Sequence, residues 1–261
     1  MNDAVRQRAK DLFAQHRARA HFVPFSGAQA LADLAEAYAV QEAYVALRCA
    51  YEGARVAGWK IGLTSLRMQA LLGIDSPIAG AVLAPQLLAS GAAIARDDYV
   101  HLGLETEIAV RLGADLPAAG APYTRDTVAG AVAAVCAAIE VVDDRAADYA
   151  VTDIGSLVAD NSWNEGVVLG SFREEWPDLA GVTGHVLSNG VEIDRGSGAD
   201  VLGHPFEPLT WLANHLAARG AGLRAGDIVS TGSIATTRFP QAAEECRFVV
   251  EGIGEVVLEV R

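Results

Sequence analysis

The chain has 261 residues, of which 51% are hydrophobic, enough for a substantial core in one large domain or in one domain with a small partner. Its formal net charge of −13 argues against nucleic acid as a ligand, because phosphates are bound by patches of Lys and Arg. Three widely separated cysteines, no apolar run approaching roughly 18 residues and an amino terminus without a hydrophobic signal core predict a soluble, cytoplasmic protein without disulfides or membrane contact.

The first 55 residues are predicted to form a small helical region. An Ala-rich helix is expected over approximately residues 3–20. In the next segment, spacings of three and four that are typical of a helix face separate Leu31, Leu34, Tyr38, Gln41 and Val45. For most of these residues, two surface helices without a functional role are the favoured interpretation.

Residues 56–63 are predicted to form a strand, and residues 65–72 a short helix followed by loops. Lys60 lies among the apolar residues of this strand. Its local pattern fits a lysine that reaches solvent from an edge strand. It also fits a charge placed beside an acidic site.

Three acidic residues stand out because each lies in an apolar stretch. Residues 101–112 alternate as a β-strand does, so Glu105 and Glu107 share one face with their Cα atoms roughly 6.5–7 Å apart. Like charges so placed repel each other and are costly in a folded interior. Glu140 is a lone acid in a second apolar run. A hard cation bound by all three glutamates removes that cost, so one metal site is predicted.

Residues 124–138 are predicted to form a helix, with Thr124 as its N-cap, that leads into the strand of Glu140. Residues 143–145, Asp-Asp-Arg, then fit either a solvated turn or groups that support the acidic site. Residues 160–162, Asp-Asn-Ser, fit a simple Asx turn as well as a functional one.

The second half of the chain is rich in short β segments. Asn189-Gly190 is a strong signal for a type I′ hairpin between two of them, and residues 247–260 form a second predicted hairpin. An amphipathic helix is expected over residues 208–219, and a strand begins near residues 226–230. We therefore predict an α+β protein.

This α+β arrangement consists of a helical amino-terminal region, residues 1–55, on a mainly β, metal-binding catalytic domain, residues 56–261. The histidines form no HxH or HExxH pair, so zinc chemistry is not expected.

Eight short motifs occur in an order that resembles a known enzyme group. They are Gly58-Trp-Lys-Ile-Gly-Leu-Thr-Ser65, Glu105-Thr-Glu-Ile-Ala109, Ile139-Glu-Val-Val-Asp-Asp-Arg145, Val158-Ala-Asp-Asn161, Val201-Leu-Gly-His-Pro205, Ala225-Gly-Asp-Ile228, Thr231-Gly232 and Glu251-Gly-Ile-Gly254. Together they resemble the 2-keto-4-pentenoate hydratase / 4-oxalocrotonate decarboxylase group of the fumarylacetoacetate hydrolase superfamily. The resemblance runs from about residue 30 to the end of the chain.

The resemblance implies a fold, a metal and a set of site residues. It implies a β-rich carboxyl-terminal domain in a homo-oligomer, able to associate with a pathway enzyme. It also implies Mg²⁺ or Mn²⁺ at Glu105, Glu107 and Glu140. For the other positions, catalytic roles are expected at Lys60, Asp160 and Ser162, and substrate contacts at Thr231, Gly232, Ile78 and Arg238. Lys60 is expected either to pair with the substrate carboxylate or to relay a proton, and both roles stay open.

The chemistry implied is that of a metal-dependent lyase acting on small 2-oxo or 2-hydroxydienoic acids through a metal-stabilised enolate, in the catabolism of aromatic or related compounds. Hydratases of the group tend to have Asp where this chain has Ile78, and decarboxylases carry Ile there. Ile78 therefore favours decarboxylation of a 2-oxo-enedioate, and a 2-keto-4-pentenoate hydratase is the alternative. More distant alternatives are a C–C hydrolase of diketo acids and a non-catalytic partner subunit.

Two further departures from the group's pattern bear on the pocket. Trp163 stands where a small polar residue is usual, so the pocket is expected to be reshaped. After Thr231-Gly232, residues 233–238, Ser-Ile-Ala-Thr-Thr-Arg, replace the Gly-rich segment of the group. The last of them is Arg238. It is suited either to pairing with the distal carboxylate of a diacid or to the surface.

Overall fold

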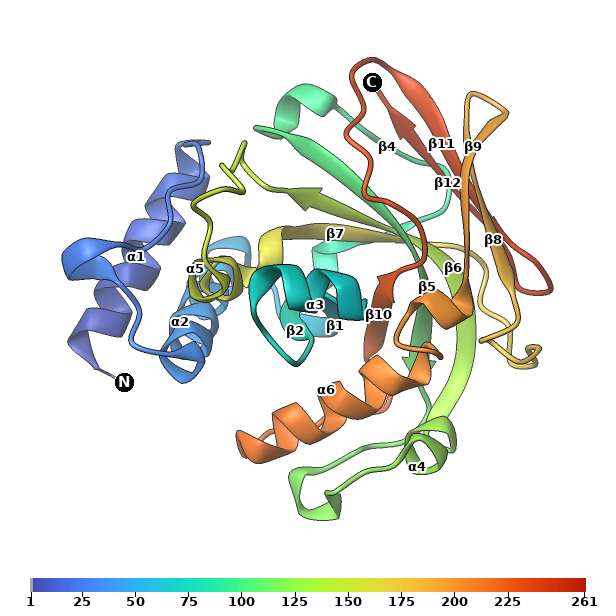
Figure 1. Ribbon diagram of the computed structural model, residues 1–261, viewed down its shortest axis with the longest axis horizontal. Coiled ribbons are helices and arrows are strands. Elements are labelled where there is room, and N and C mark those ends of the chain that lie inside the picture. Colours follow the sequence, from blue (N-terminus) through green and yellow to red (C-terminus); the bar gives the residue numbers. More distant parts are fainter. Residues whose placement is uncertain (1) are drawn as a thin grey trace.

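The computed structural model describes residues 2–261 as two β-sheets with helices packed around them (Figure 1). Helix and strand occur in similar amounts, and the helical amino-terminal part expected from the sequence is present. The α+β class is therefore confirmed. Within residues 2–261, no helix combines the length and apolar character needed to cross a membrane.

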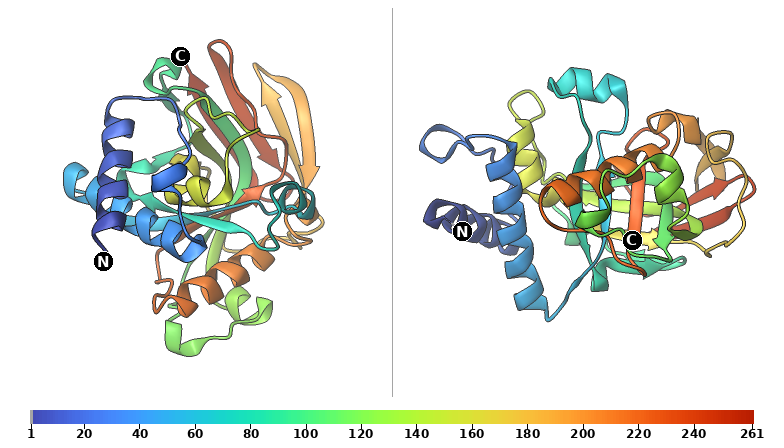
Figure 2. Two further views of the ribbon diagram at one scale, coloured as in Figure 1. Left: turned by 60° about the vertical axis from the view of Figure 1, so that its left-hand side comes forward. Right: turned by 90° about the horizontal axis from the view of Figure 1, so that it is seen from below.

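The amino-terminal part is a pair of packed helices. Helix α1 spans Asp3–Arg17 and is capped by the side chain of Asn2; helix α2 spans Leu34–Glu52 and is capped by Asp33. Gly53 ends α2 in the left-handed conformation that glycine adopts without strain. Apolar side chains of both helices share a core cluster with strand β2, and both views of Figure 2 show the pair on the opposite side of the molecule from Thr183–Ser197 of the second sheet.

The first sheet carries the strands of the predicted metal site. Its order is β2 (Ile78–Leu83), β1 (Val56–Gly62), β10 (Ile228–Ser233), β5 (Leu102–Leu112), β6 (Val132–Asp143), β7 (Asn164–Leu169) and β3 (Leu87–Ala89). Strands β5 and β6 are its long central pair and run antiparallel from Leu102↔Asp143 to Leu112↔Val132. Both are buried along most of their length, so a charged side chain on either strand faces the interior unless the sheet opens around it.

The second sheet covers part of the first. Its order is β4 (Ala92–Ile94), β12 (Gly254–Val260), β11 (Glu244–Val250), β8 (Thr183–Ser188) and β9 (Val191–Ser197). The predicted hairpins are confirmed: Asn189 and Gly190 both have positive φ between β8 and β9. Strands β11 and β12 contact β6, and buried residues of all three strands belong to the largest hydrophobic cluster.

Shorter elements complete the fold. The remaining α-helices are α3 (Leu66–Leu72), α4 (Arg125–Ala129), α5 (Ile154–Ala159) and α6 (Phe206–Ala218). Short 3₁₀ turns lie at Gly27–Gln29, Ala84–Gln86, Arg96–Asp98, Ala118–Gly120, Asn161–Trp163 and Gly198–Asp200.

The predicted helix over residues 124–138 is wrong beyond its first turn. Thr124 does cap a helix, but that helix ends at Ala129, and Val132 already begins strand β6. The Ala- and Val-rich run has moderate helix propensity. In the fold residues 132–138 pair with β5, and Ala138 also pairs with Leu169 of β7, so ladder hydrogen bonds and burial outweigh local preference.

Candidate metal centre and substrate pocket

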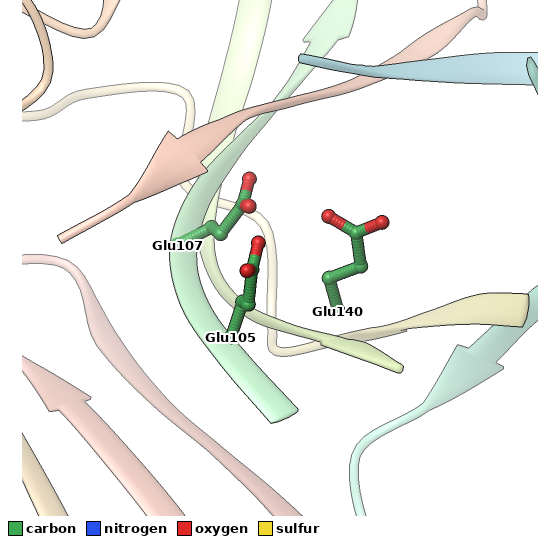
Figure 3. A group of neighbouring side chains, drawn as sticks. All are labelled: Glu105, Glu107 and Glu140. Carbon is green, nitrogen blue, oxygen red and sulfur yellow. The ribbon is translucent and has the colours of Figure 1, made fainter. Parts of the chain in front are cut away.

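The structure brings Glu105, Glu107 and Glu140 together. One carboxylate oxygen of each lies within 4.8 Å of the others. Glu105 and Glu107 leave the same face of β5, and Glu140 is the register partner of Glu105 on β6, so all three carboxylates point into one space (Figure 3). This arrangement is what the alternation of the strand predicts for the first two residues, whereas the position of Glu140 depends on strand pairing.

The sheet orients Glu107 and Glu140 and leaves part of each carboxylate open. Glu107 Oε2 accepts hydrogen bonds from Ser230 Oγ at 2.6 Å and from the Gly232 backbone N–H at 2.8 Å. Glu140 Oε1 accepts one from Asn164 Nδ2 at 2.8 Å. Glu107 Oε1 and Glu140 Oε2 are buried, and neither has a hydrogen-bond partner among the residues that the structure describes.

These open oxygens fit a cation. Burial and the neighbouring carboxylates raise the pKa of Glu107 well above its usual range, and burial raises the pKa of Glu140 to about 7 although Lys60 opposes this. Buried oxygens without donors are expensive, and a hard divalent ion uses carboxylate oxygens as ligands. The donor set therefore suits Mg²⁺ or Mn²⁺.

Lys60 places a positively charged side chain beside the three glutamates. Its side chain is buried on β1, and Nζ lies 3.2 Å from Glu140 Oε1. Burial opposes the charge, but Glu140, Glu105 and Glu107 outweigh it and raise the pKa of the ammonium group. Of the two readings that the sequence left open, the structure supports the charge beside an acidic site, because this lysine does not reach solvent.

A pocket of about 320 Å³ opens beside the three glutamates. Lys60 and Glu105 bring the acidic cluster into its wall, and further polar groups come from Asp144, Tyr149, Thr152, Ser162 and Thr237. Apolar side chains form most of the remaining wall: Leu63, Ile78, Val142, Leu157, Trp163 and Phe239. A small molecule with one polar end that reaches the carboxylates and an apolar body fits this distribution.

The other predicted site residues lie in different places. Thr231 is buried and donates to the Ile108 carbonyl, and Gly232 contributes its backbone N–H to Glu107. Asp160 lies behind the pocket and not in its lining, paired with His16 and Arg145. Arg238 is also absent from that lining, since its Nη2 pairs with Glu244 Oε2 at 3.0 Å. The structure thus places Ser162 and Ile78 in the pocket, and Thr231, Asp160 and Arg238 outside its wall.

Residues 143–145 do not form a solvated turn, because all three are buried. Asp144 reaches the pocket wall, where its carboxylate accepts from Tyr149 Oη at 2.8 Å and lies 2.8 Å from His101 Nδ1. Asp143 accepts backbone N–H groups at the start of β5, including that of His101 at 2.8 Å. These acids therefore hold the segment before β5 in place through hydrogen bonds.

Sequence reasoning missed several groups that shape the site. Thr237 Oγ1 donates to Glu105 Oε1 at 2.7 Å, and Asn164 holds Glu140. Tyr149 and Phe239 line the pocket from loops without a periodic pattern. The one sequence signal for them was position: Phe239 follows Arg238, and Tyr149 lies shortly after Asp144. Closeness in sequence does not show that a side chain contacts the pocket.

The turn that carries Ser162 is strained. Asn161, Ser162 and Trp163 have φ values of 50°, 51° and 60°, a left-handed run that non-glycine residues adopt at a cost. The Asn161 side chain bonds both the N–H and the carbonyl of Ala81, which ties the turn to β2. A Cβ on Gly80 would lie 2.6 Å from the Asn161 carbonyl oxygen, so glycine permits this approach.

Comparison with protein families identifies one match. Residues 74–261 match the model described as fumarylacetoacetate (FAA) hydrolase C-terminal. A 2-keto-4-pentenoate hydratase from Burkholderia vietnamiensis is 36% identical over 86% of this chain and 85% of its own length. A 4-oxalocrotonate decarboxylase from Pseudomonas putida is 32% identical over 85% of this chain and 83% of its own.

Solved structures show a likeness over the whole chain. The 4-oxalocrotonate decarboxylase from Pseudomonas putida G7, complexed with magnesium and adipate, has a TM-score of 0.93 at 27% identity. The similarity covers 100% of this chain and 98% of that one. The same enzyme complexed with calcium and acetate has a TM-score of 0.91.

Proposed function

Because the chain belongs to the fumarylacetoacetate hydrolase family, we propose that its pocket binds a small 2-oxo or 2-hydroxydienoic acid beside Mg²⁺ or Mn²⁺ held by Glu105, Glu107 and Glu140. The protein is a lyase, as its hydratase and decarboxylase relatives are. The observation that carries the proposal is the pair of orphaned buried oxygens, Glu107 Oε1 and Glu140 Oε2, which lie next to Glu105 and Lys60 of the pocket wall.

The metal assignment rests on the chemistry of the donors. The described residues of the cluster are all carboxylates, which favour a hard cation over a soft one, and a solved relative is described as complexed with magnesium. When bound, such an ion supplies a Lewis acid that stabilises negative charge on a substrate oxygen.

The chain's own residues supply orientation and protons. Lys60, kept charged by the surrounding acids, is available to pair with the substrate carboxylate or to pass a proton to substrate carbon. Ser162 Oγ, 3.3 Å from the Ala79 carbonyl, faces the same pocket and can turn toward a substrate oxygen. The apolar wall excludes water from the rest of the substrate.

Between the two reactions of the group, we favour decarboxylation of a 2-oxo-enedioate. Addition of water needs a group that activates it, and Ile78 occupies the position where hydratases of the group tend to have Asp. Asp144, the other carboxylic acid in the lining besides Glu105, already accepts from Tyr149 and Ala146 and contacts His101. Loss of CO₂ needs no activated water.

Hydration is the second candidate. The observation in its favour is the 34–36% identity to several relatives named as hydratases, compared with 32% to the decarboxylase. The group also includes a relative named "TodF product hydratase".

We further propose a cytoplasmic homo-oligomer, able to associate with a pathway enzyme, in the catabolism of aromatic or related compounds. Support comes from the three free cysteines, which suit a reducing compartment, and from the family resemblance.

The test is to supply Mg²⁺ with a short panel of 2-hydroxydienoates and 2-oxo-enedioates and to follow CO₂ and hydrated product separately. CO₂ release from an enedioate supports the decarboxylase. A 4-hydroxy-2-oxo acid product overturns that assignment in favour of the hydratase. Metal binding without any turnover supports a non-catalytic partner and contradicts the proposal.

A further inference from the structure

The amino-terminal helix reaches the turn that carries Ser162. His16, in the last turn of α1, hydrogen-bonds through Nε2 to Asp160 Oδ1, and its Nδ1 lies 3.5 Å from Glu165 Oε1. The imidazole is 15% exposed and packs on Tyr44 of α2 with ring centroids 4.9 Å apart. Asp160 itself is buried, so this contact joins two elements that are 144 residues apart in sequence.

A second cation, Arg145, also pairs with Asp160. Its other carboxylate oxygen, Oδ2, pairs with Arg145 Nη2. Arg145 also donates through Nη1 to the Ala20 carbonyl at 3.1 Å, and its own carbonyl accepts from the Phe22 N–H at 2.9 Å. The segment that follows α1 is therefore tied to the loop after β6, and through Arg145 and Asp160 to the turn that carries Ser162.

Asp160 is the point from which the strained turn begins. It ends α5, with its N–H bonded to the Ser156 carbonyl, and its own carbonyl accepts from the Trp163 N–H at 2.9 Å. The left-handed residues between them place Ser162 and Trp163 in the pocket wall. The next residue, Asn164, holds Glu140. A strained turn persists only where its surroundings over-determine it, and the ion pairs of Asp160 provide that constraint.

We propose that His16 is a positioning residue for the substrate pocket: as a cation it fixes Asp160, and through Asp160 it holds Ser162 and Trp163 in place. This inference rests on the proposed function of the pocket, since it concerns how that pocket is kept in shape. His16 does not line the pocket, and its effect is indirect.

The charges around His16 balance only when it is protonated. His16 contacts Asp160, which ends α5, Glu165 of β7 and Tyr44 of α2. Arg48 of α2 pairs with the same Glu165, and Arg145, from the loop after β6, pairs with the same Asp160. Arg48 also pairs with Glu52, so three cations meet three carboxylates. Burial opposes the charge on His16, but Asp160 and Glu165 raise its pKa to about 9. A neutral His16 leaves Asp160 with one cation.

The test uses His16→Gln, which removes the cation, and Arg8→Gln as a matched control. Arg8 is a buried cation of the same helix, and its side chain pairs with Glu36 at 2.9 Å and bonds the carbonyls of Gln29 and Ala30, away from Asp160. We expect His16→Gln to lower kcat at least tenfold with Mg²⁺ and the best substrate, and to accelerate amide exchange at Asp160 and Trp163. Arg8→Gln is expected to leave both quantities unchanged.

A third variant separates positioning from general damage. In the wild type, kcat should fall as pH rises through about 9, and His16→Lys should restore activity at neutral pH and move this decline to higher pH. The proposal is overturned if His16→Gln keeps wild-type kcat and amide exchange, or if Arg8→Gln loses as much as His16→Gln. It is also overturned if the alkaline decline is the same in His16→Lys.

The exchange measurement does not depend on turnover. If the wild type converts no substrate, the proposed function fails, and local exchange at Asp160 and Trp163 in the variants still decides the role of His16. If His16→Gln does not fold, the pH profiles of the wild type and His16→Lys decide it.

Discussion

Glu105 and Glu140 lie directly opposite each other on adjacent antiparallel strands. Like charges in such a cross-strand pair are destabilising, and Glu107 adds a third carboxylate on the same face. The sheet therefore holds a repelling cluster that a divalent cation stabilises, and this cluster accounts for acids that look misplaced in the sequence.

Glu107→Gln tests the metal centre through stability as well as activity. Because ionised Glu107 is costly without a cation, we expect the metal-free variant to unfold at a temperature equal to or above that of the metal-free wild type. Mg²⁺ should raise the unfolding temperature of the wild type and have little effect on the variant, and activity should be lost. Thermal unfolding with and without Mg²⁺ measures this. A variant that remains fully active and is stabilised by Mg²⁺ refutes the assignment.

Thr237→Val tests a group that orients a ligand without being one. Valine has nearly the same shape but cannot donate the 2.7 Å hydrogen bond to Glu105 Oε1. Loss of such a partner weakens metal affinity by about 10- to 100-fold, and we expect the lower end because Glu105 keeps its place on β5. Calorimetric titration with Mg²⁺ or Mn²⁺ gives the affinity. Unchanged binding would mean that Thr237 serves packing only.

Sequence patterns were sufficient for much of the fold and for the identity of the acids. Alternation in β5 correctly put Glu105 and Glu107 on one face, and Asn189-Gly190 correctly marked a hairpin. Residues 132–138 misled because alanine and valine fit a helix locally, and it is pairing with β5 that makes them a strand. Sequence periodicity contains no information about which strands become neighbours.

The site was less accessible to sequence reasoning for the same reason. Lys60 looked like an edge-strand lysine, yet β1 lies between β2 and β10, where its side chain is buried beside Glu140. Asp160 looked like part of a simple turn, and its partners His16 and Arg145 become visible only when α1 folds against the loops. Such long-range ion pairs leave no spacing signal in a single sequence.

Ile78→Asp tests the choice between decarboxylation and hydration. A Cβ on Gly62 would lie 3.3 Å from Ile78 Cγ1 and 3.4 Å from Lys60 Nζ, so residue 78 and the ammonium group face the same small space. A carboxylate introduced there can pair with Lys60 and accept a proton from water. We expect the ratio of hydrated product to CO₂ to rise in product analysis by NMR. Conversely, an unchanged ratio in a folded variant assigns Ile78 to packing and removes the basis for favouring the decarboxylase.

The pH dependence of stability tests the charge on His16. Its pKa rises from 6.5 to about 9 on folding, so protonated His16 stabilises the native state fully below about pH 6.5, and this contribution is lost as pH rises toward 9. The shift corresponds to a contribution on the order of 3 kcal/mol at most. Denaturant unfolding of wild type and His16→Gln between pH 6 and 9.5 should therefore give a difference in unfolding free energy that is largest at pH 6 and shrinks toward pH 9.

Arg8→Gln should differ from the wild type by a constant amount over the same range, because arginine does not titrate there. A constant difference for His16→Gln would show that His16 packs as a neutral ring against Asp160.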